Sequence, residues 1–128
     1  MIRVDTNIIV RYFADDIKEQ ADKAQEILEN EEVFISSEVI AEVIYVMCGI
    51  YEFSREDISE ALIQLINFEN IYVESKYFLI KALRLFSSTK LDFVDCLLCA
   101  YSEVDEIRTF DKKLLKCIDK NKKNIYKS

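Results

Sequence analysis

Short apolar segments alternate along the chain with longer segments in which apolar residues recur every three or four positions. The short segments have the length and composition of strands: Ile2–Val4, Val33–Ile35, Ile71–Val73 and Glu106–Phe110. The longer segments have the spacing of helices that bury one face. Strands that alternate with helices predict an α/β fold around a parallel sheet.

Polar residues mark where the predicted helices begin and end. Thr6 or Asn7 is the expected N-cap of the first helix, and Ser36 or Ser37 of the third, which runs to Gly49 as its expected C-cap. The remaining helices are predicted at Lys18–Asn30, from a capping box at Ser54–Asp57 through Ile66, at Tyr77–Phe86, from Asp92 through Tyr101, and from Asp111 to at least Ile118.

The chain has 128 residues, of which 51% are hydrophobic, and it contains no repeat or linker. We therefore expect a single domain over residues 1–128 with a core of its own. No apolar stretch approaches the roughly 20 residues of a membrane span. The N-terminus MIRVDTN lacks the features of a secretory signal, so we expect a cytoplasmic protein.

Four cysteines occur at positions without a disulfide pattern. Cys96 and Cys99 have the spacing of a redox or zinc pair, but leucines separate them and no second pair exists. In a reducing cytoplasm we expect all four to be small buried hydrophobic residues.

Four carboxylates lie alone within or beside apolar segments, at Asp5, Glu42, Asp95 and Asp111. Burying an unpaired carboxylate costs several kcal/mol, so a shared cation would explain all four. Asp5 and Asp111 each follow a predicted strand, Asp95 lies in the first turn of a helix, and Glu42 lies one to two turns into the helix after the second strand. Sites in open α/β sheets form at the carboxyl ends of the strands. We therefore expect the four acids to meet in one pocket.

Each acid also has a structural explanation. Asp5 and Asp111 could cap helices, and Asp95 could favour a helix N-terminus beside an Asp92 cap. Glu42 lies too deep in its helix to cap it, and no basic residue is near it in sequence. A buried ion pair with a distant partner remains open for Glu42.

The chain contains no His, which excludes a His-dependent catalytic triad within it. Carboxylate ligands without imidazole or thiolate suit Mg²⁺ or Mn²⁺ rather than zinc. Several carboxylates around such ions suit phosphoryl chemistry, in which the metal activates a water molecule.

Four segments together resemble the motifs of PIN-domain ribonucleases, and especially VapC-type toxins of toxin–antitoxin pairs. They are VDTNIIVRYF at residues 4–13, SSEVIAEVIYVM at 36–47, LDFVDCLLCA at 91–100 and RTFDKKL at 108–114. The match covers nearly the whole chain with the motifs in family order.

This resemblance implies a Mg²⁺ or Mn²⁺ site formed by Asp5, Glu42, Asp95 and Asp111, supported by Asn7 and Thr109. Asp92 fits either an outer contact of that site or a helix cap. The resemblance also implies a three-layer sandwich with a parallel sheet of four to five strands, and hydrolysis of RNA phosphodiester bonds. It further implies a homodimer that a small antitoxin protein blocks.

The net charge of −7 argues against a binder of nucleic acid over the whole surface. Residues 112–128 carry seven Lys against one Asp, whereas the other residues carry ten basic and 23 acidic side chains. Any RNA contact must therefore be local, and the basic residues near the motifs are Arg11, Arg108, Lys112 and Lys113.

Two other functions remain open. A catalytically idle PIN-like module could bind RNA or a protein, although it would have no reason to keep four acids. A phosphatase of similar α/β shape would offer a nucleophilic Asp with a second Asp two residues later, where this chain has Asn7.

Overall fold

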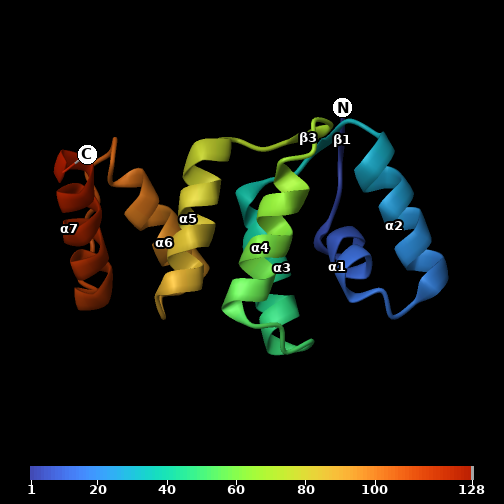
Figure 1. Ribbon diagram of the computed structural model, residues 1–128, viewed down its shortest axis with the longest axis horizontal. Helices are drawn as coiled ribbons and strands as arrows, with labels where there is room; N and C mark the ends of the chain where they lie inside the picture. The colour runs from blue at the N-terminus through green and yellow to red at the C-terminus, as the bar shows by residue number, and fades with distance from the viewer. Residues whose placement is uncertain (128) are drawn as a thin grey trace. The chain divides into compact units, whose positions relative to one another are not determined.

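The structure is a computed structural model that describes the backbone of residues 1–127 and the side chains of residues 1–124 (Figure 1). Helices and strands alternate through its first half, as predicted. The elements are β1 (Ile2–Arg3), α1 (Thr6–Ala14), α2 (Lys18–Asn30), β2 (Val33–Phe34), α3 (Ser37–Gly49), α4 (Arg55–Ile66), β3 (Ile71–Tyr72), α5 (Lys76–Ser88), α6 (Phe93–Tyr101) and α7 (Lys112–Lys127). Within the described residues, no helix is long and apolar enough to cross a membrane.

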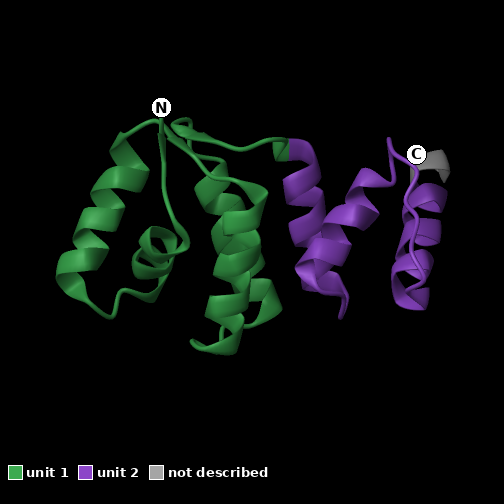
Figure 2. Cartoon of the chain, turned by 180° about the vertical axis from the view of Figure 1, so that it is seen from behind, with its two compact units in different colours: residues 1–76 green, residues 77–128 purple. Residues whose placement is uncertain are grey.

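The chain divides into two compact units, which Figure 2 distinguishes by colour. Unit 1 comprises Met1–Lys76 and contains the whole sheet. Unit 2 begins at Tyr77 and is helical wherever the structure assigns it regular secondary structure.

Unit 1 is built on a three-stranded parallel sheet in the order β1-β2-β3. Ile2 pairs with Val33, which pairs with Ile71. Parallel neighbours require crossover connections, which α1 and α2 provide between β1 and β2, and α3 and α4 between β2 and β3. All three strands therefore end at the same edge of the sheet, and α1 and α3 begin just beyond it.

The sheet has three strands among the described residues instead of the four to five expected. The segment predicted as a strand at Glu106–Phe110 is not one. Its side chains alternate between exposed and half-buried. A strand also needs a neighbouring strand for its N–H and C=O groups, and the structure pairs none of the described strands with this segment. The α/β class and the parallel pairing are confirmed.

The helix boundaries follow from the predicted caps in two cases. Ser36 caps α3 and Ser54 caps α4, and each hydroxyl accepts a hydrogen bond from the N–H three residues later. Gly49 is not a C-cap as predicted: it is the last residue of α3, and Ile50 follows in a right-handed conformation. The left-handed residue that ends α1 is Asp15, with φ of 50°.

The core of unit 1 consists of aliphatic side chains from all four of its helices and from the strands β2 and β3. Each contributes about 1.5–3 kcal/mol by leaving water. The fully buried ones are Ile9, Leu28, Val33, Ile35, Ile40, Val43, Met47, Ile58, Leu62 and Ile66. This packing holds the carboxyl edge of the sheet and the starts of α1 and α3 in place.

In unit 2, polar and covalent contacts join α6 to α7. Cys99 and Cys117 form a disulfide, with their Cα atoms 6.1 Å apart. The buried Asn121 amide donates to Cys99 O at 3.0 Å and to Ser102 Oγ at 3.2 Å. The expectation that all four cysteines are unpaired hydrophobic residues is therefore wrong for Cys99 and Cys117, since helix packing brings together residues that are 18 positions apart. Cys96 is buried and unbonded to another cysteine, as expected.

Candidate metal centre

Asp5 lies two residues after the end of β1 and caps α1. Its Oδ1 accepts a hydrogen bond from Ile8 N at 3.2 Å. The prediction that Thr6 or Asn7 is the cap was wrong, because both already belong to the first turn of the helix. The alternative cap reading of Asp5 is confirmed. Capping occupies one carboxylate oxygen, so it is compatible with a second role for this side chain.

Glu42 lies on α3 and is hydrogen-bonded to the first residue of α1. Thr6 Oγ1 donates to Glu42 Oε2 at 2.8 Å. This contact links the residue after Asp5 to the acid that had no cap to explain it. The sequence reasoning overlooked Thr6 in this role. The sequence feature that could have indicated this role is a hydroxyl side chain directly after an acid that follows a predicted strand.

The four acids are less buried than the sequence suggested. Asp5, Glu42 and Asp111 are exposed, and Asp95 is half-buried. The predicted desolvation cost therefore applies to Asp95 alone. Glu42 was expected to be buried within an apolar helix, but α3 turns this position away from the core while Ile40, Val43 and Met47 face inward.

In unit 2, Asp95 lies in the first turn of α6, near two other carboxylates. Its pKa is raised above its usual value by burial, and further by the negative charges of Asp111 and Asp92. Asp92 occupies the N-cap position of α6 without a side-chain capping bond. A bound cation would offset the negative charge that surrounds Asp95.

Asp111 is held by the start of α7. Its Oδ1 accepts hydrogen bonds from Lys113 N at 2.8 Å and Leu114 N at 3.1 Å, which confirms the cap alternative. Thr109 Oγ1 accepts a hydrogen bond from Asp111 N at 3.0 Å. Thr109 therefore orients the backbone of Asp111. Asn7 is exposed in the first turn of α1.

Two of the four predicted basic residues are engaged in ion pairs. The Arg11 guanidinium lies 3.0 Å from Asp16 Oδ1 and 3.2 Å from Tyr51 Oη. Arg108 forms an ion pair with Glu106. Lys112 and Lys113 are exposed at the start of α7.

The donor set fits a hard divalent cation. Its candidate ligands are carboxylate oxygens, which Mg²⁺ and Mn²⁺ prefer. Within either unit taken alone, the described residues do not gather three acidic or thiol side chains closely enough to hold one ion. Asp5 and Glu42 belong to unit 1, and Asp95 and Asp111 belong to unit 2.

Comparison with known proteins identifies the family. The profile described as "PIN domain" matches residues 2–120, which run through both units. The VapC ribonuclease of Aquifex aeolicus (strain VF5) is 27% identical over 121 residues, covering 88% of this chain and 89% of the relative. No solved structure gives a significant match. The family profile covers far more than half of the chain, and this protein therefore belongs to the PIN domain family.

Proposed function

We propose that this protein is a metal-dependent endoribonuclease of the VapC type. Membership of the PIN domain family carries the proposal, because it coincides with acids at the motif positions. The similarity to a VapC ribonuclease along most of both chains supports RNA as the substrate. We further propose that residues 1–128 act as a single PIN domain.

We propose that Asp5, Glu42, Asp95 and Asp111 together hold Mg²⁺ or Mn²⁺. The raised pKa of Asp95, which burial and neighbouring acids cause, supports a cation at that carboxylate. When bound, such a metal lowers the pKa of a coordinated water and neutralises negative charge on the phosphate.

The chain's own residues would position these ligands. Thr6 holds one oxygen of Glu42, and Thr109 fixes the backbone that carries Asp111. Caps restrain Asp5 and Asp111 at helix starts while using one oxygen of each. Ligands that are already oriented lose less conformational entropy when the substrate and metal bind.

The proposed setting is the cytoplasm, with the protein acting as the toxin of a toxin–antitoxin pair. The resemblance to VapC-type toxins supports an antitoxin protein that covers the acidic site, and a homodimeric assembly.

Metal dependence provides the direct test of the proposal. We expect the purified protein to cut a labelled RNA in Mn²⁺ or Mg²⁺, to stop when EDTA is added, and to recover when Mn²⁺ is supplied in excess. Internal cleavage products on a denaturing gel are the readout. Cleavage that is indifferent to EDTA would contradict the proposed metal site.

An idle PIN-like binding module is the second candidate function. It is favoured by the observation that neither unit alone gathers three ligands among its described residues. Calorimetric titration with Mn²⁺ separates the two candidates. A saturable site supports the nuclease, and the lack of one supports the idle module.

Thr6 provides a test of ligand positioning. Thr6→Val keeps the side-chain shape and removes the hydroxyl that donates to Glu42, whereas Thr6→Ser keeps the hydroxyl. Outer contacts to metal ligands are typically worth about 10- to 100-fold in activity or metal affinity. We expect Thr6→Val to lose activity and Mn²⁺ affinity in that range and Thr6→Ser to retain both. Identical behaviour of the two variants would show that the hydrogen bond has no role.

A further inference from the structure

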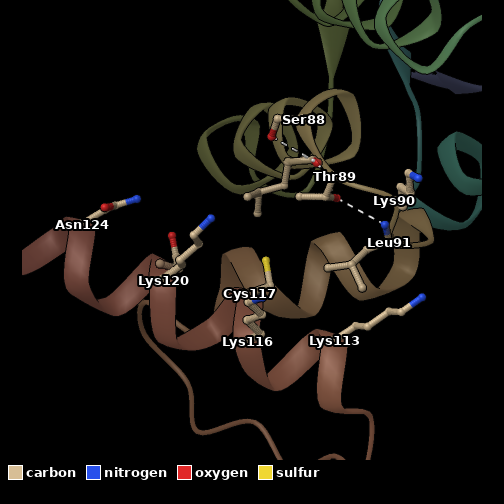
Figure 3. Close-up of a pocket in the computed structure, with 11 residues that line it drawn as sticks. Ser88, Thr89, Lys90, Leu91, Lys113, Lys116, Cys117, Lys120 and Asn124 are labelled. Carbon is tan, nitrogen blue, oxygen red and sulfur yellow. Dashed lines mark hydrogen bonds between the residues drawn. The ribbon is translucent and has the colours of Figure 1, made fainter.

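Unit 2 contains a cavity of about 560 Å³ whose charged lining consists of lysines. Figure 3 shows it between α7 and the segment that leads from α5 into α6. We call it the lysine groove and define it by Lys90, Lys113, Lys116 and Lys120, with Leu91 and Cys117 beneath them. Among the described residues that line this cavity, none carries a carboxylate.

The lysines of the groove are available to an external anion. The ion pairs among the described residues involve Lys81, Arg11 and Arg108 as the cations, so none uses a lysine of the groove. Lys113, Lys116 and Lys120 follow one another at helical spacing on a single face of α7. They span about 10 Å at the rise of an α-helix.

Contacts beneath the lysines fix the rotation of α7. The disulfide joins Cys117, in the floor of the groove, to Cys99 of α6. One turn further along, the buried Asn121 donates to Cys99 O and to Ser102 Oγ. The lysine face is therefore held toward the groove before any ligand arrives, which lowers the entropic cost of binding.

One end of the lysine groove leads to the acids of unit 2. Lys90, Leu91 and Lys113 lie together at that end in Figure 3, and Asn124 lies at the other. Leu91 directly precedes Asp92 in the sequence, and the backbone N–H of Lys113 donates to Asp111. The two walls of the groove thus run into the N-termini of α6 and α7, which carry Asp95 and Asp111.

A second cavity extends the groove at its other end. This cavity has a volume of about 690 Å³ and shares Leu85, Ser88, Asn121 and Asn124 with the first. It adds Arg84, which has no ion pair with a described residue, and the Lys81–Glu103 ion pair, whose two charges offset each other. Positive charge therefore continues beyond Lys120, away from the acids.

We propose that the lysine groove binds the phosphate backbone of single-stranded RNA on one side of the cleavage site. This inference rests on the proposed ribonuclease function for its orientation toward Asp95 and Asp111. A stacked strand carries one phosphate per 3.4 Å, so the lysine face of α7 would meet about three phosphates. An extended acidic peptide presents successive side chains on opposite faces, and so offers fewer charges to such a row.

The experiment measures RNA binding separately from cleavage. The full chain is titrated with a fluorescein-labelled uridine oligoribonucleotide in EDTA, and anisotropy is followed at several salt concentrations. We compare Lys116→Gln/Lys120→Gln with Lys122→Gln/Lys123→Gln. Both pairs remove two charges from α7, but the control lysines are exposed and do not line the groove.

The groove variant should bind RNA about 25-fold more weakly at about 0.1 M salt. The plot of the log of the association constant against the log of the salt concentration should become shallower, its slope decreasing in magnitude by about 1.4. The control variant should change each quantity much less. Equal losses in the two variants would overturn the inference, because they would indicate attraction to the overall charge of α7. Displacement of the RNA by polyglutamate as effectively as by unlabelled RNA would also overturn it, in favour of an acidic protein partner.

The outcome is independent of the proposed function. If the protein binds RNA through the groove but never cuts it, the proposed function fails and the groove assignment survives. If the groove variant binds RNA like the wild type while the wild type cuts RNA in Mn²⁺, the function survives and the groove assignment fails.

Discussion

Asp5→Asn is expected to abolish RNA cleavage while leaving the fold intact. Asparagine caps helices as well as aspartate does, so the hydrogen bond to Ile8 N can persist and α1 should keep its start. The substitution replaces a negative ligand of the proposed metal with a neutral amide. Since a catalytic metal supplies several kcal/mol of transition-state stabilisation, we expect a loss of about 10³-fold in kcat/KM.

The matched control for this variant is Asp22→Asn. Asp22 is exposed on α2, is not one of the proposed ligands, and undergoes the same chemical change. We expect it to cut RNA at the wild-type rate. Circular dichroism and urea unfolding of both variants establish that the fold persists. Wild-type cleavage by Asp5→Asn in Mn²⁺ would remove this carboxylate from the site.

Cys117→Ser is expected to lower the free energy of unfolding by about 3 kcal/mol in the absence of a reductant. The wild-type disulfide closes a loop with a sequence separation of 18. A crosslink of that span lowers the conformational entropy of the unfolded chain and so raises its free energy by about this amount. Urea denaturation of oxidised wild type and variant provides the comparison. Adding dithiothreitol should destabilise the wild type and leave Cys117→Ser nearly unchanged.

Cys48→Ser is the control for the disulfide. Cys48 is half-buried and is not disulfide-bonded, so its loss should change stability little, and the variant should remain sensitive to dithiothreitol. Thiol titration of the unfolded, unreduced wild type should detect only Cys48 and Cys96. Four reactive thiols would contradict the pairing. In a reducing cytoplasm the pair would remain as thiols, and α7 would depend on Asn121 and on packing.

The helices of this protein were predictable because their signals are local. Apolar residues at helical spacing defined α2 at its observed bounds, Lys18–Asn30. Ser36 and Ser54 marked helix starts because a hydroxyl can accept the otherwise unpaired N–H groups of the first turn. The strands of the sheet were located to within one residue for the same reason.

The strand predicted at Glu106–Phe110 failed because a strand is not a local structure. An alternating pattern shows that a segment could pair, but pairing requires another strand beside it. Gly49 is a similar case. Glycine permits a left-handed conformation, yet α3 continues through it, and Asp15 adopts that conformation at the end of α1.

The proposed site also combines features that local sequence predicts with features that depend on long-range packing. Asp5, Glu42, Asp95 and Asp111 were identifiable as acids in apolar surroundings and as matches to PIN motifs. Their exposure was not predictable, because a charged residue within an apolar helix is compatible with either face. The bond from Thr6 to Glu42 crosses 36 positions and depends on how α1 packs on α3.

Local sequence signals were sufficient for the α/β class, for the starts of α3 and α4 and for the identity of the candidate acids. They suffice because capping, periodicity and residue chemistry act over a few neighbouring positions. Long-range packing was required to pair Cys99 with Cys117, to raise the pKa of Asp95 through burial and through Asp111 and Asp92, and to align lysines of α7 with Lys90. Each of these depends on distances between segments that are far apart in the chain, which no local pattern encodes.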